Sequence, residues 1–295
     1  MLVSVIVITY NSSPYVLETL ESAYRQTYPD LELIVSDDCS SDNTFALCQE
    51  WVSAHASRFR RALCTQTPRN LGICGNNNHA LTHATGEWVK YIAGDDFLRH
   101  NCIERMVANL KEGTALYFCN SDSYDNSTHK VIYHLRFILP DGSARRQMRM
   151  MLKTEYDLGG PSLFVRRQAL LEVGGFDTRF PMMEDFPIAM RFLAHGKNIH
   201  VVPESLVVWR MHGDNVSFTG RCSDSRNEAK WHYAKTYCLR HGLPLHLYSY
   251  WVSHWVLHHH RNGLHKALGY LLRCFDIVHI KRRFFPVVTQ QYERA

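Results

Sequence analysis

Two adjacent carboxylates, Asp95 and Asp96, follow an apolar segment at residues 88–92 that is predicted to be a buried strand. In open α/β sheets, ligands bind at the carboxyl ends of the strands. Two neighbouring carboxylates repel each other unless a cation or hydrogen-bond donors compensate their charge. A Mg²⁺ or Mn²⁺ ion shared with the phosphates of a substrate would do so. The alternative is a solvated turn after the strand.

The elements that would position this pair start at the N-terminus. Residues 2–8 form a nearly continuous β-branched run, which is typical of a central parallel strand. A helical pattern at 15–25, a second strand at 31–35 and a second helix at 44–54 complete a βαβα unit. Both strands end in polar residues, which are therefore expected at the same edge of a sheet.

Seven segments of the chain carry a family resemblance. They are VSVIVITYN, QTYPDLELIVSDDCSSDNT, NLGICGNNN, ATGEWVKYIAGDD, GGFD, MEDF and RMHGDNVS. In this order and spacing, over roughly residues 1–218, they resemble bacterial family 2 glycosyltransferases with the GT-A fold. The resemblance implies an α/β, Rossmann-like, mostly parallel sheet flanked by helices. It also implies transfer of a sugar from a UDP-sugar to an acceptor hydroxyl with inversion at the anomeric carbon.

The resemblance further implies a set of residues that bind the nucleotide-sugar. They are Thr9, Tyr10, Asn11, Asp38, Asn70, Gly72, Asn78, Asp95 and Gly160. Asp38 would bind the uracil ring, although it could instead brace the turn before a helix. Asp95 would lie near the ribose, and Gly160 beneath the donor sugar, where glycine permits close backbone approach. Asn77 departs from the family, because relatives usually carry Arg or Lys there.

The metal and the catalytic base are implied in the same way. Asp96 and His212 would hold Mn²⁺ or Mg²⁺, which neutralises charge on the departing nucleoside diphosphate. Asp185 would be the general base that takes the proton of the acceptor hydroxyl, and Glu184 would orient the acceptor. Asp185 could also cap the helix predicted at 187–194.

Charge divides the chain near residue 220. Residues 221–295 hold 12 Lys and Arg against 4 Asp and Glu, with many aromatic residues. We therefore expect a catalytic domain at 1–220 and a helical C-terminal region at 221–295. The basic and aromatic tail, including Trp251, Trp255 and the run 281–285, indicates a peripheral membrane surface and not nucleic acid. Alternatively, its aromatic residues form the core of a helical subdomain.

Composition indicates an ordinary globular protein in a reducing compartment. Hydrophobic residues make up 45% and charged residues 21%, and the nine cysteines form no CxxC pair. The first apolar run is short and lacks a preceding basic region, so we expect no signal peptide. These features predict a cytoplasmic protein at the inner face of the plasma membrane.

The sequence as a whole predicts a metal-dependent glycosyltransferase. Its donor would be a UDP-hexose or UDP-N-acetylhexosamine, and its acceptor an undecaprenyl-pyrophosphate-linked saccharide in O-antigen or capsule assembly. Sugar specificity is expected in a loop between Asn120 and Gly160, with Arg145, Arg146 and Arg149, and in the tail. The alternative is a non-catalytic nucleotide-sugar or glycan-binding module, which would have no need of both a base and a metal set.

Overall fold

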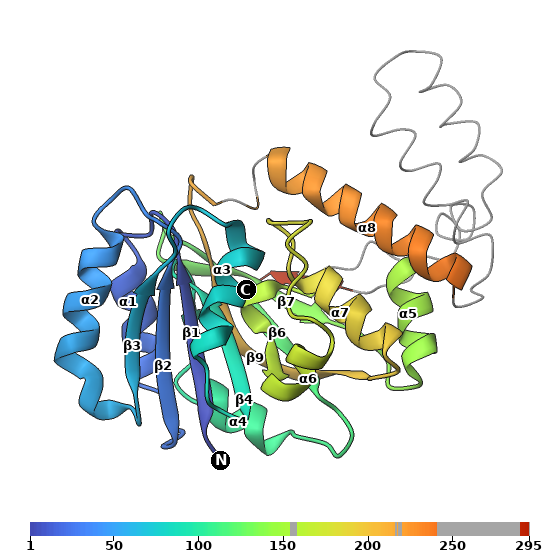
Figure 1. Cartoon of the computed structure of the whole chain (residues 1–295), viewed down its shortest axis with the longest axis horizontal. Helices are drawn as coiled ribbons and strands as arrows, with labels where there is room; N and C mark the ends of the chain where they lie inside the picture. The colour runs from blue at the N-terminus through green and yellow to red at the C-terminus, as the bar shows by residue number, and fades with distance from the viewer. Residues whose placement is uncertain (154–157, 216, 218–219, 241–289, 295) are drawn as a thin grey trace, which may run out of the picture.

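The computed structural model describes residues 1–153, 158–215, 217, 220–240 and 290–294. A ten-stranded sheet runs through the molecule in the order β10-β7-β6-β8-β4-β1-β2-β3, with β9 beside β6 and β5 beside β9 (Figure 1). The strands are β1 (Val3–Thr9), β2 (Leu31–Asp37), β3 (Ala62–Gln66), β4 (Trp88–Ala93), β5 (Phe97–Leu98), β6 (Leu116–Asp125), β7 (Lys130–Phe137), β8 (Phe164–Arg166), β9 (Ile199–Met211) and β10 (Gln290–Arg294).

Helices cover both faces of this sheet (Figure 1). They are α1 (Val16–Tyr24), α2 (Thr44–His55), α3 (Gly72–His83), α4 (Cys102–Ala108), α5 (Ala144–Lys153), α6 (Arg167–Glu172), α7 (Asp185–Ala194) and α8 (Gly220–Arg240), with 3₁₀ turns at Ala56–Arg58 and Gly160–Ser162. Helices α1, α2 and α4 pack on one face, and α3, α5, α6, α7 and α8 pack on the other. The predicted strands and helices of the first 100 residues are confirmed within one or two residues.

The first half of the sheet is parallel because each strand returns through a helix. β1 lies between β2 and β4, and all three run parallel. Val5 and Val7 are fully buried, as the β-branched run at the N-terminus predicts. The second half is mixed: β8, β7 and β10 pair antiparallel with their neighbours, whereas β9 runs parallel to β6. The sheet is therefore less uniformly parallel than expected.

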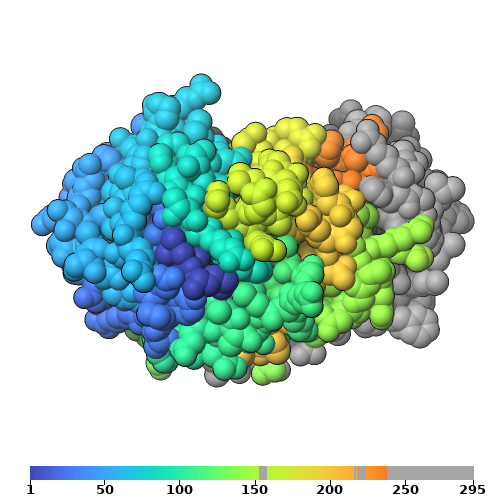
Figure 2. All heavy atoms as spheres, turned by 60° about the horizontal axis from the view of Figure 1, so that its bottom comes forward, coloured from blue at the N-terminus to red at the C-terminus, as the bar shows by residue number. Residues whose placement is uncertain are grey.

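The segment expected to be a specificity loop between Asn120 and Gly160 is largely regular structure. It contains most of the β6–β7 hairpin and helix α5. Apolar residues of α5, such as Met148 and Met151, belong to the core, while Arg145, Arg146 and Arg149 are exposed. In Figure 2 the yellow-green surface near residues 170–180 lies against the cyan surface of the α3 region.

Part of the region at 221–295 packs into the core described above. Helix α8 packs on α7, and Ala229, Tyr233 and Ala234 belong to the same core as α3 and α7. For Tyr233 the alternative interpretation, an aromatic residue in a core packed on residues 1–220, is correct. The region is also not wholly helical, because β10 pairs with β7 at the edge of the main sheet. Trp251, Trp255 and residues 281–285 lie outside the described residues.

Candidate active site

Asp95 and His212 meet at the carboxyl ends of two strands. Asp95 follows β4, and His212 follows β9. Oδ2 of Asp95 lies 3.1 Å from Nε2 of His212. Asn215 supports the pair, since its side-chain amide accepts the backbone N–H of His212 at 2.6 Å and contacts the imidazole at 3.2 Å. The ring of Tyr15 packs on the imidazole with centroids 4.3 Å apart.

Asp96 faces the protein interior. Its side chain is 2% exposed, and Oδ1 accepts the backbone N–H of Arg210 at 2.9 Å. Burial, and next the neighbouring carboxylate of Asp95, raise the pKa of Asp96 well above its usual range. The structure thus brings Asp95, and not Asp96, into contact with His212.

Arg210 connects this edge to the rest of the sheet. It is 3% exposed, and its guanidinium donates to the carbonyl of Asp95 at 2.8 Å, to Asn126 at 2.6 Å and to Glu18. The guanidinium also lies 5.2 to 5.5 Å from the ring centroids of Tyr15, Phe97 and Tyr124. Sequence reasoning assigned no role to this residue. Arg210 donates to the carbonyl of Asp95 and therefore fixes the backbone that carries Asp95 and Asp96.

The Asp95–His212 pair fits a divalent cation. Two adjacent ligands of an octahedral ion with bonds of about 2.1 Å lie about 3 Å apart, and the two side chains have that spacing. Carboxylate oxygens suit both Mg²⁺ and Mn²⁺. Within the described ranges no group of three or more His, Cys, Asp or Glu side chains could hold a metal. Further ligands would therefore come from a bound phosphate or water.

Polar residues at the carboxyl ends of β1 and β2 form hydrogen bonds with one another. Thr9 donates to Asp37 at 2.8 Å, and Asp37 also accepts from Ser40 and Gln66. Asn11, at a φ of 49°, accepts the N–H of Ser41 at 2.9 Å. These contacts fix the two strand ends side by side. Thr9 is buried, whereas the neighbouring Tyr10 is 48% exposed.

Asp38 braces the start of α3. Its two carboxylate oxygens accept the N–H groups of Leu71 and Gly72, each at 2.8 Å, and a third bond comes from Thr67 at 2.9 Å. Asn70 adds a bond to the N–H of Gly72 at 3.1 Å. The structure thus brings Asp38, Asn70 and Gly72 together, with the carboxylate of Asp38 bound by the protein itself, and their contact with a nucleotide stays a prediction.

The three asparagines of α3 face different partners. Asn76 bonds Ser36 of β2, while Asn78 both donates to and accepts from the backbone of Phe176 at 2.9 Å. Asn77 is 2% exposed, and its side-chain oxygen lacks a hydrogen-bond partner among the described residues. Asn78, expected near the nucleotide, therefore connects α3 to the loop before α7.

Asp185 is the first residue of α7 and holds the turn that precedes β8. Oδ2 accepts the N–H groups of Leu158 and Gly159 at 3.2 and 3.1 Å, and Oδ1 accepts that of Phe186 at 2.7 Å. Glu184 occupies the cap position without a side-chain cap bond. A Cβ atom at Gly160 would lie 1.7 Å from a carboxylate oxygen of Glu184, so a larger residue there would require the Glu184 side chain to move. The structure thus joins Asp185, Glu184 and Gly160 in one unit.

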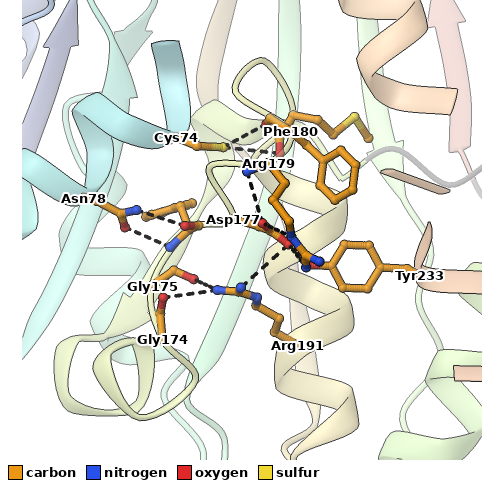
Figure 3. A network of polar contacts seen from close by, with 11 residues as sticks. Cys74, Asn78, Gly174, Gly175, Asp177, Arg179, Phe180, Arg191 and Tyr233 are labelled. Atoms are coloured by element: carbon orange, nitrogen blue, oxygen red, sulfur yellow. Dashed lines mark hydrogen bonds and ion pairs between the residues drawn. The ribbon is translucent and has the colours of Figure 1, made fainter. Parts of the chain in front are cut away.

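A network around the buried Asp177 anchors α7 to α3 and α8 (Figure 3). Asp177 accepts from Arg179 at 2.6 Å and from the hydroxyl of Tyr233 at 2.6 Å, and Arg191 of α7 lies 3.6 Å away. Burial opposes ionisation, but the bonds from Arg179 and Tyr233 outweigh it and hold the pKa of Asp177 well below its usual range. The GGFD segment, residues 174–177, therefore helps to fix the orientation of α7, which begins at Asp185.

A cavity of about 460 Å³ adjoins His212, within the size range of small-molecule sites. Its lining combines one aromatic ring, a polar turn and the loop after β9, and consists of Tyr15, Asp125, Asn126, Ser127, Ile132, Met211, His212 and Gly213. No sequence pattern indicated this lining, because it joins three separate segments.

Comparison with protein families and curated proteins supports a single assignment. The model described as "Glycosyl transferase family 2" matches residues 4–174. An uncharacterized glycosyltransferase of Rickettsia typhi is 24% identical over 78% of this chain and 70% of its own length. The UDP-Glc:alpha-D-GlcNAc-diphosphoundecaprenol beta-1,3-glucosyltransferase WfaP of Escherichia coli is 30% identical over 42% of this chain. The match spans less than half of WfaP, 46%.

Solved structures show the same fold. TarS of S. aureus in complex with UDP-GlcNAc superposes with a TM-score of 0.61 at 18% identity, covering 96% of this chain and 92% of TarS. The mannosyltransferase PcManGT of Pyrobaculum calidifontis, in complex with GDP-Man and Mn²⁺, gives a TM-score of 0.60 at 17% identity, covering 96% and 87%. The expected GT-A fold is confirmed.

Proposed function

Because the chain belongs to glycosyl transferase family 2, we propose that it transfers a hexose or N-acetylhexosamine from a UDP-sugar to a saccharide hydroxyl, with inversion. The observation that carries this proposal is the meeting of Asp95 with His212 beside Asp96. Such a pair suits a cation-assisted departure of a nucleoside diphosphate. The ordered residues around Asp37 and Asp38 support a nucleotide pocket at the neighbouring strand ends.

Each residue of the site has a role in this proposal. Asp95 and His212 would hold Mn²⁺ or Mg²⁺, which would supply Lewis-acid stabilisation of the leaving diphosphate. The strand-end residues Thr9 and Asn11 and the loop braced by Asp38 enclose the base and ribose. Asp185 takes the proton of the attacking hydroxyl, because a carboxylate locked by backbone N–H groups keeps a fixed position.

The acceptor is proposed to be a saccharide on undecaprenyl pyrophosphate, in the assembly of a surface polysaccharide. WfaP, by its name, acts on such an acceptor. Within the described ranges, none of the helices combines the length and apolar character that a bilayer-spanning helix requires. The basic, aromatic residues 221–295 would then bring the enzyme to the lipid surface by charge attraction and interfacial burial.

A donor screen tests the function directly. The purified chain is incubated with UDP-Glc, UDP-Gal, UDP-GlcNAc or UDP-GalNAc and a pyrophosphate-lipid saccharide, with Mn²⁺, Mg²⁺ or chelator. We expect acceptor-dependent and metal-dependent UDP release with one donor, and a product of inverted anomeric configuration by NMR. Donor binding without transfer to any acceptor would favour the alternative, a non-catalytic binding module.

A further inference from the structure

Lys90 is a fully buried lysine in the middle of β4. It is 0% exposed and lies between Trp88 and Ile92 on the face that packs against α1 and α4. Its ammonium group donates to the carbonyl of Tyr91 at 3.1 Å, to that of Leu163 at 3.3 Å and to that of Pro161. Three donors thus meet three backbone acceptors.

Burying the ammonium group of Lys90 costs free energy unless its three N–H groups are hydrogen-bonded. The three carbonyl acceptors are therefore held in place around it. β8 pairs with β4 only as far as Lys90, opposite Phe164. Beyond that point the 3₁₀ turn Gly160–Ser162 takes the place of a strand beside β4. The ammonium of Lys90 therefore joins the turn to β4 where the regular ladder ends.

The same turn is held from its other side by the proposed base. Asp185 accepts the N–H groups of Leu158 and Gly159. Within the turn, the hydroxyl of Ser162 contacts the carbonyl of Leu158 at 3.0 Å and that of Gly159 at 2.7 Å. A continuous series of bonds thus runs from β4, which carries Asp95 and Asp96 at its end, to Asp185.

We propose that Lys90 is a positioning residue for glycosyl transfer, which sets the place of Asp185 relative to the carboxylate pair by fixing the turn at 158–163. This inference rests on the proposed function and adds a residue to it. Lys90 does not touch substrate. Its loss should lower the rate of transfer far more than it weakens binding of the nucleotide, because the strand ends proposed to bind the base and ribose are held by other contacts.

The test is a double-mutant cycle with Asp185→Asn. Lys90→Met keeps a long, unbranched side chain and removes all three donors. Ser162→Ala is a milder change in the same turn, which keeps the test decisive should Lys90→Met fail to fold. Glu32→Gln is the matched control, since Glu32 is a fully buried charge held by Ser4, Thr85 and Gly86 at the opposite end of the sheet. Folding is checked by circular dichroism and thermal melting.

We expect Lys90→Met to lower kcat about 10-fold or more, and Ser162→Ala less, with the affinity for UDP within about twofold. In the Asp185→Asn background both changes should alter the residual rate less than about twofold, since the group they position is gone. Glu32→Gln should lower the melting temperature without changing kcat.

Two results would overturn the inference alone, with the wild type active. One is unchanged kcat in a folded Lys90→Met protein, or in Ser162→Ala if Lys90→Met does not fold. The other is a fold-loss of kcat from Lys90→Met or Ser162→Ala that is as large in the Asp185→Asn background as in the wild type. Absence of transfer by the wild type with every donor would overturn the proposed function and this inference with it.

Discussion

Asp95 and His212 are 117 positions apart in the chain, yet their side chains lie 3.1 Å apart. The contact exists because β4 and β9 end at the same edge of one sheet, where Arg210 binds the carbonyl of Asp95. Asp96, the residue that the sequence favours as the metal ligand, is turned toward the backbone of Arg210. The two aspartates can therefore be distinguished by experiment.

The first prediction concerns the cation. Asp95→Asn and His212→Ala should each weaken Mn²⁺-dependent UDP binding about 10-fold or more, because each removes a ligand. Asp96→Ala should also lower turnover, because it removes the acceptor of the Arg210 backbone N–H and so loosens the strand end that precedes His212. Calorimetry with Mn²⁺ and with chelator separates metal-dependent from metal-independent affinity. Full activity of the Asp96→Ala variant in chelated buffer would contradict the metal hypothesis.

The second prediction concerns the base. Asp185→Asn keeps the side-chain shape but cannot accept a proton, so kcat should fall about 100-fold or more. Donor affinity should change little, because Asp185 contacts the turn at 158–159 and not the strand ends. Steady-state kinetics and UDP titration measure the two effects. A fall of donor affinity in step with rate would make Asp185 a binding residue.

The third prediction concerns stability and pH. The pKa of Asp177 is below its ordinary value of 3.8, so its ionised form stabilises the fold above that pH. This stabilisation is lost as pH falls below 3.8 toward the folded-state pKa. Asp177→Asn should lower the free energy of unfolding by about 2 kcal/mol at pH 7, since it removes the charge-assisted bond from Arg179, whose half-exposed guanidinium stays solvated. The variant should also lose less stability than the wild type between pH 4 and pH 2 in urea unfolding.

Tyr233→Phe is the matched variant for this network. It removes one bond to Asp177 and keeps the ring in the core, so we expect a smaller loss of about 1 kcal/mol. Equal pH dependence in the wild type and in Asp177→Asn would show that the depressed pKa is not a source of stability.

The fourth prediction concerns the basic tail. Replacing Lys281, Arg282 and Arg283 by Gln should weaken binding to anionic vesicles and lower activity on long-chain lipid acceptors. Activity on a short soluble acceptor should be largely spared. Vesicle binding by the wild type should weaken with salt without vanishing, because aromatic burial is not screened. Equal loss on both acceptors would indicate a structural role only.

The sequence by itself determined the first half of the fold and the chemistry of its edge. The β-branched run at 2–8 and the helical spacing at 15–25 are local patterns, and local patterns specify strand and helix directly. Ordered motifs indicated the family and picked out Asp38, Asp95 and Asp185 as site candidates.

Only the tertiary structure decided which of these groups meet. Sequence spacing carries no information on the partner of a carboxylate, so the contact of Asp95 with His212 and the use of Asp38 to brace α3 emerged from the packing of distant strands and loops. Lys90 is the clearest case. A lysine within an apolar strand is a visible irregularity, but its role depends on the turn beside β4, which lies about 70 residues later in the chain. Contacts of this kind form only when the whole sheet is assembled, because each joins backbone and side chains from elements that are neighbours in space alone.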